Sequence, residues 1–89
     1  MSIEVRKPTE KELEELGVFS WGIWEKEEGV FDWHYDKKEI CYFLDGDVDI
    51  TLDDGRIVSI GKGNLVTFPK GLSCRWHIKK GVRKHYFFE

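Results

Sequence analysis

From residue 18 onward, short stretches of the sequence alternate hydrophobic and polar residues at every second position. A period of two is typical of β-strands, because successive side chains of a strand point to opposite faces. The Gly- and Asp-containing segments 45–47 and 53–55 predict hairpin turns, and 61–63 and 80–81 predict further reversals. Eight short strands at this spacing predict an all-β sandwich or barrel. The eight predicted strands are 19–24, 30–35, 39–44, 48–52, 56–60, 65–68, 73–78 and 82–88.

One helix is predicted, near the N-terminus, over residues 9–16. Thr9 and Glu12 have the spacing of a capping box, in which the first residue caps the helix and the second lies at its third position. Gly17 is well placed to end the helix in a left-handed conformation. Two turns are too short to be stable alone, so we expect the helix to lie against the sheet as a lid or plug.

Length and charge narrow the classes of function. The 89 residues are predicted to form a single domain, with a barrel over about 18–88. The chain shows neither a signal peptide nor an apolar stretch of membrane-spanning length, so we expect a cytoplasmic protein that does not associate with membranes. A net charge of −3 with both signs interspersed argues against nucleic acid as a partner. Abundant Lys and Glu suggest a thermophilic source, and the two cysteines are expected to be free thiols.

Two sequence motifs resemble those of a known family. Residues 63–74 fit a Gly-x5-Pro-x-Gly-x2-His pattern, except that Cys74 stands at the histidine position, and Glu39 and Gly46 fit a Glu-x6-Gly pattern. Residues 18–88 therefore resemble the small cupin 3 (DUF861) group, related to the cupin domains of ureidoglycine aminohydrolase and of ethanolamine-utilisation proteins. The resemblance implies a cupin-type double-stranded β-helix, or jelly-roll barrel, with one short N-terminal helix.

The first histidine pair of a metal-binding cupin has two possible counterparts in this chain. With three residues before Glu39, the pair corresponds to Trp33 and Tyr35, and with four residues it corresponds to Asp32 and His34. Side chains alternate across a strand, so only one of the two pairs faces the pocket. The first register is favoured, because burying aromatic rings stabilises the fold and the charged residues stay in water.

The choice of register decides the metal prediction. In the favoured register only Glu39 and Cys74 remain at ligand positions, which is too few for a tight site, so no metal or other cofactor is expected. In the other register, a divalent transition metal such as Zn, Fe, Mn or Ni would be held by His34, Glu39 and Cys74, with Asp32 beside them.

The same alternation predicts the lining of a pocket inside the barrel, and the resemblance implies that the face of the last strand carrying Lys84 and Tyr86 lies inside the pocket or at its mouth. Glu39 and Lys84 are the candidate catalytic residues, as an acid and a possible base. A buried Glu39 needs a partner, and Lys84, Tyr35 and Tyr86 are available. The residues predicted to line the pocket around them are Trp33, Tyr35, Phe43, Cys74, Trp76 and Tyr86.

Three functions remain open at this point. The first is a cupin without metal that binds a small polar molecule with an apolar body. The second is a metal-dependent cupin enzyme acting on a small nitrogenous or carboxylated metabolite, which the resemblance suggests. The third is a non-catalytic structural or regulatory barrel whose aromatic interior is ordinary core. A homodimer is expected in each case, since a domain this small gains from burying more apolar surface.

Overall fold

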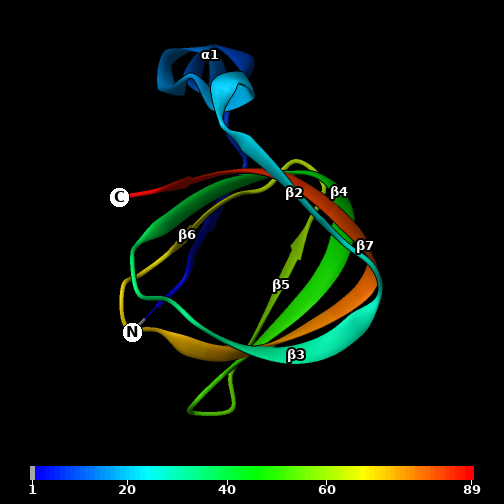
Figure 1. The fold of residues 1–89 in the computed structure, drawn as a ribbon. Helices are drawn as coiled ribbons and strands as arrows, with labels where there is room; N and C mark the ends of the chain where they lie inside the picture. The colour runs from blue at the N-terminus through cyan, green and yellow to red at the C-terminus, as the bar shows by residue number, and fades with distance from the viewer. Residues whose placement is uncertain (1) are drawn as a thin grey trace.

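The computed structural model describes residues 2–89, which form strands wrapped around a common interior and one helix outside them (Figure 1). The fold is the all-β jelly roll that the sequence predicts. Its elements are β1 (Glu4–Arg6), α1 (Glu10–Leu16), the 3₁₀ turn η1 (Val18–Ser20), β2 (Gly22–Lys26), β3 (Gly29–His34), β4 (Glu39–Leu52), β5 (Ile57–Gly61), β6 (Leu65–Phe68) and β7 (Ser73–Phe88).

Two long strands, β4 and β7, organise the barrel. They pair antiparallel along most of their length, from Glu39–Phe88 to Leu52–Cys74. The first half of β4 also pairs with β6, and the last part of β7 pairs with β2. The second half of β4 pairs with β5, and the first part of β7 pairs with β3. All seven strands belong to one sheet, which the two long strands close around its interior.

The sequence predicts four strands where the structure has β4 and β7, and that prediction is wrong. Residues 45–47 form no hairpin turn but a bend within β4, where the register against β7 shifts at an irregularity. Gly46 has a φ of 126°, and a Cβ there would lie 2.9 Å from Val82 Cγ2. Bulges of this kind bend a strand, so the glycine serves a barrel corner.

The same bend reverses the alternation along β4. Glu39, Cys41 and Phe43 are buried before it, whereas Val48 and Ile50 are buried after it. The inward positions therefore change from odd to even numbers. The paired strand β7 keeps its even-numbered residues inward before and after residues 80–81. Residues 80–81 therefore continue the strand and do not form the predicted reversal.

The predicted helix is confirmed as α1. The Thr9 hydroxyl accepts a hydrogen bond from the Glu12 backbone N–H at 3.2 Å, and Gly17 ends the helix with a φ of 70°. The helix lies outside the ring of strands, with Leu13 buried, and contributes no side chain to the pocket (Figure 1). It is therefore not the lid or plug expected from the sequence.

The core lies inside the barrel and consists of Tyr35, Cys41, Phe43, Val48, Ile50, Leu52, Ile60, Val66, Phe68, Leu72, Cys74, Trp76, Ile78 and Val82. Both cysteines are buried free thiols, as predicted.

No helix among residues 2–89 is long and apolar enough to span a membrane. The homodimer, the cytoplasmic location and the thermophilic source stay predictions.

Candidate functional site

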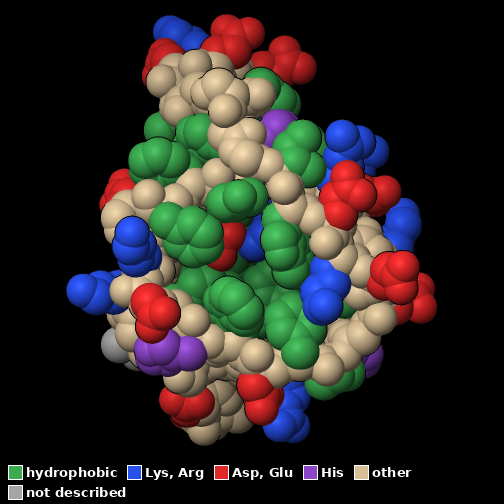
Figure 2. Space-filling view, viewed as in Figure 1, with side chains coloured by type: hydrophobic (Ala, Val, Ile, Leu, Met, Phe, Trp, Pro, Cys, Tyr) green, Lys and Arg blue, Asp and Glu red, His purple; other side chains and the backbone are tan. Residues whose placement is uncertain are grey.

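A pocket of about 230 Å³ opens into the interior of the barrel. Figure 2 shows it as a hollow ringed by hydrophobic side chains, with one acidic and one basic group visible at its bottom. The lining comes from β2, from β3 and the residue after it, from the start of β4 and from β7. The lining residues are Trp24, Phe31, Trp33, Tyr35, Glu39, Trp76, Lys84, Tyr86 and Phe88.

The alternation along β3 decides which side chains enter the pocket. Phe31 and Trp33 point inward, as does Tyr35 directly after the strand, and all three line the pocket. Asp32 and His34 lie on the opposite face and border a different, shallow depression on the outside of the barrel. The structure therefore has the register that places aromatic side chains inside.

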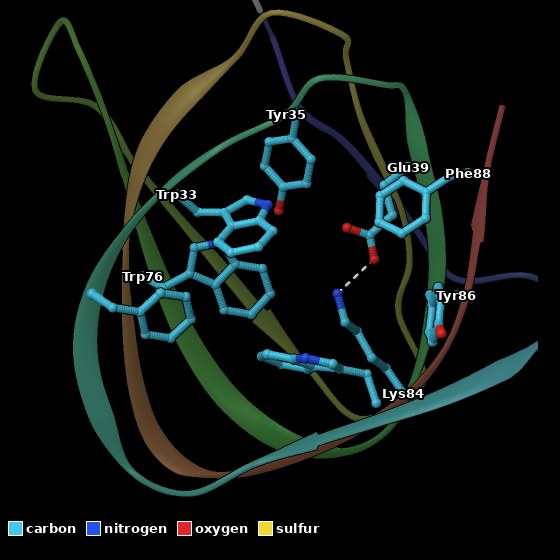
Figure 3. A pocket seen from close by; sticks show the side chains of 9 residues that line it. Trp33, Tyr35, Glu39, Trp76, Lys84, Tyr86 and Phe88 are labelled. Carbon is cyan, nitrogen blue, oxygen red and sulfur yellow. Dashed lines mark hydrogen bonds and ion pairs between the residues drawn. The ribbon is translucent and has the colours of Figure 1, made fainter.

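Glu39 and Lys84 form an ion pair at the bottom of the pocket (Figure 3). Lys84 Nζ donates a hydrogen bond of 2.7 Å to Glu39 Oε2, and each side chain is only 5% exposed. The Lys84 ammonium also lies 4.9 Å from the ring centroids of both Trp24 and Trp76. A carboxylate and two electron-rich ring faces thus surround one buried positive charge.

The phenol of Tyr35 is the next polar group of the pocket. Figure 3 shows its hydroxyl directed toward the interior, and Tyr35 Oη and Trp76 Nε1 are both buried without a hydrogen-bond partner. Burial, and secondly the charge of Glu39, raises the pKa of Tyr35 far above its ordinary range. The neighbouring Trp76 indole acts in the opposite direction and lowers the pKa of Tyr35, but it is the smallest of the causes. Tyr35 therefore keeps its proton and offers the pocket a hydrogen-bond donor, not a base.

Two of the residues predicted to line the pocket lie elsewhere. Phe43 is fully buried beneath the pocket, with its ring centroid 6.3 Å from that of Trp76. Cys74 packs in the core and borders the outer depression, and burial raises the pKa of its thiol to about 11. Burial likewise raises the pKa of Cys41 to about 12. Neither thiol is an activated nucleophile, because the thiolate is the reactive form.

The residues present do not fit a metal centre. Across residues 2–89, no three His, Cys, Asp or Glu side chains come close enough together to hold a metal ion. The structure does not bring the alternative ligand set of His34, Glu39 and Cys74 together, since Glu39 pairs with Lys84 inside and His34 Nδ1 lies 2.7 Å from Ser73 Oγ on the outer face. The positive charge beside Glu39 is supplied by a lysine.

Sequence reasoning misses Trp24, which lines the pocket from β2. Its position follows from pairing, because Trp24 lies opposite Lys84 in the β2–β7 ladder. Phe31 and Phe88 also line the pocket without being among the predicted lining residues, although the inward alternation of their strands is a signal that could have found them. The β2–β7 register could not be read locally, since the paired residues of the two strands are about 60 positions apart along the chain.

Comparison with known proteins places the chain in a family. The model of the EutQ-like cupin domain matches residues 13–86, most of the chain. The chain belongs to the EutQ-like cupin family. It is 38% identical over 74 residues to the acetate kinase EutQ of Clostridioides difficile, a match covering 83% of this chain and 46% of that protein. The chain therefore spans about half the length of this curated relative.

Two solved structures of this family are similar over nearly the whole chain. A DUF861 family protein of Thermotoga maritima is 52% identical, with a TM-score of 0.97 and coverage of 99% of this chain and 100% of that one. The EutQ protein of C. difficile is 32% identical, with a TM-score of 0.69 and coverage of 97% and 66%. The suggested relation to ureidoglycine aminohydrolase stays a prediction.

Proposed function

We propose that this EutQ-like cupin binds a small, planar, uncharged molecule through a carbonyl oxygen and a neighbouring N–H or O–H group. The observation that carries the proposal is the Glu39–Lys84 pair at the bottom of an otherwise aromatic pocket. Specific small-molecule sites combine apolar walls with a few placed polar groups, and this pocket has that composition.

The walls favour a flat ligand. Phe31 and Trp76 stack with ring centroids 5.7 Å apart and planes inclined by 17°. Trp33, Tyr86 and Phe88 complete the rim. A planar body placed among such rings removes apolar surface from water at roughly 25 cal/mol per Å². The pocket volume of about 230 Å³ admits only a small ligand.

The polar groups favour an uncharged ligand with a donor beside an acceptor. Lys84 and Glu39 together carry no net charge, so a charged ligand would bring a third charge into the barrel without a partner. Lys84 has further N–H groups to donate to a carbonyl oxygen, and the Glu39 carboxylate can accept from an N–H or O–H. A primary carboxamide or a lactam presents this combination on one edge.

Three probes of nearly equal shape test the proposal. Benzamide, benzoate and benzamidine share a planar head group and differ mainly in charge, and each can be titrated into the labelled protein and followed by NMR chemical shifts of the Trp24 and Trp76 indole groups. We expect benzamide to bind most tightly and to lose binding in Glu39→Leu. Asp32→Asn is the matched control, because Asp32 is exposed and outside the pocket.

The same titration tests a carboxylate ligand. The curated C. difficile relative is named an acetate kinase. Acetate and benzoate would enter this pocket as a third charge, so we expect both to bind more weakly than benzamide. Tighter binding of either anion, or shifts confined to residues outside the pocket, would overturn the proposed ligand class.

A further inference from the structure

We propose that Lys84 is a nucleophile that forms an imine with a small aldehyde in this pocket. The inference rests on the proposed function, since it uses the same pocket and the same approach of a carbonyl group to Lys84. Among residues 2–89, Lys84 is the single buried lysine, and the other nine are exposed. Its Nζ lies at the bottom of the pocket, where the reactive group of a bound ligand would arrive.

Glu39 provides the proton acceptor that the amine requires. A lysine attacks a carbonyl only as the neutral amine, and Glu39 Oε2 lies 2.7 Å from Nζ. Transfer of one proton along this hydrogen bond makes both partners neutral, so no unpaired charge is left in a site where each side chain is only 5% exposed. The fold thus places a nucleophile and its base in direct contact.

Glu39 can then act as the acid of the second half of the reaction. The nitrogen lone pair forms a C–N bond to the aldehyde carbon, and the carbonyl π bond opens to give a carbinolamine once a proton has moved from nitrogen to oxygen. Glu39 protonates the hydroxyl, which leaves as water, and a C=N bond forms. The starting ammonium and carboxylate become an iminium and a carboxylate, so charge is conserved and no oxidant is needed.

The walls of the pocket suit the product. The ring faces of Trp24 and Trp76, 4.9 Å from the Lys84 nitrogen, stabilise a positive charge at this position. Aromatic side chains around the bond also keep away the water that would hydrolyse it. The iminium would occupy the place that the ammonium holds in the free protein.

Benzaldehyde with sodium cyanoborohydride tests the inference, because the reductant converts the imine into a stable benzylamine. Peptide mapping by mass spectrometry then gives the labelling rate of every lysine in the folded wild-type protein. We expect Lys84 to be labelled ahead of the nine exposed lysines, although exposure alone predicts the reverse. Glu39→Gln should slow labelling of Lys84 by about 10²-fold and leave the exposed lysines unchanged, as expected for loss of an acid–base group.

The result that overturns the inference is labelling that follows exposure, with Lys84 spared. Benzamide titrated in parallel separates this failure from that of the proposed function. If benzamide binds and Lys84 is not labelled, the imine inference is rejected and the proposed binding function is retained. Absence of both removes the proposed function as well. The wild-type map does not depend on the folding of any variant.

Discussion

Two ion pairs of nearly equal length join strand β7 to its neighbours in different surroundings. Lys84 Nζ lies 2.7 Å from Glu39 Oε2 inside the barrel, and Arg75 Nε lies 2.8 Å from Asp32 Oδ1 on the outside. The side chains of the inner pair are 5% exposed, whereas Arg75 and Asp32 are 62% and 74% exposed. Distance alone therefore does not distinguish them.

The two pairs differ in how much hydration their charged groups lose. An exposed pair keeps most of its hydration, gains little on pairing and is screened by salt. A buried pair loses hydration that its mutual attraction barely replaces, so it contributes little net stability, yet removal of one partner strands the other charge. The outer pair is an ordinary surface contact, and the inner pair presents two charged groups to the pocket.

The largest expected effect on stability comes from removing the carboxylate partner of the inner lysine. Glu39→Leu leaves Lys84 buried without its carboxylate, and we expect the free energy of unfolding to fall by about 3–5 kcal/mol. Urea denaturation of the wild type and the variant measures the difference. An unchanged midpoint would mean that Lys84 escapes to solvent when its partner is removed.

A smaller effect of opposite sign is expected from Tyr35→Phe. The Tyr35 hydroxyl is buried without a hydrogen-bond partner, and an unsatisfied group of this kind costs about 1–3 kcal/mol. We therefore expect the variant to melt at a higher temperature. Tyr86→Phe, at the half-buried rim of the same pocket, is the control and should melt like the wild type. A loss of stability in Tyr35→Phe would show that this hydroxyl is satisfied in solution.

A substitution in the outer pair should change the free energy of unfolding very little. Asp32→Asn removes a charge that water already solvates, so we expect a change in urea midpoint several times smaller than that of Glu39→Leu. High salt should erase what difference remains, because screening weakens exposed pairs. A large, salt-independent loss would place the two pairs in the same class.

The smallest effect concerns pH. The hydrogen bond from Arg75, and secondly its charge, lower the pKa of Asp32 below its ordinary 3.8. The folded state then binds fewer protons than the unfolded state, so the pair stabilises the fold above that value and loses this contribution as the pH falls through the folded pKa. Stability curves of wild type and Asp32→Asn should therefore converge in acid. Curves that diverge there would contradict the sign of the shift.

Much of the pocket could be predicted from alternation alone. The run from Phe31 to Tyr35 places aromatic residues on one face and Asp32 and His34 on the other, whatever the partner strand. Lys84 could be named only as one of several partners for Glu39. Its side chain starts opposite Phe43 and must reach along the barrel to meet the carboxylate, a path set by neighbouring strands.

The corner at Gly46 shows why other features could not be predicted. The sequence Asp45-Gly46-Asp47 has the composition of a hairpin turn, yet the strand continues because β7 pairs with it on both sides. The space that a side chain would need is filled by Val82, far away in the sequence. Phe43 and Cys74 illustrate a second limit, because pointing inward does not decide whether a residue reaches the pocket or lies beneath its wall.

The double variant Glu39→Leu/Lys84→Met tests most directly whether the inner pair serves a ligand and not the fold. It replaces both charges by apolar side chains of similar size, a change that is neutral or stabilising by about 1–4 kcal/mol for comparable buried pairs. Urea denaturation and benzamide titration are measured on the same sample. We expect stability equal to or above that of the wild type, with benzamide binding lost. A clear loss of stability with benzamide binding intact would show that the pair holds the barrel together and that the ligand is recognised elsewhere.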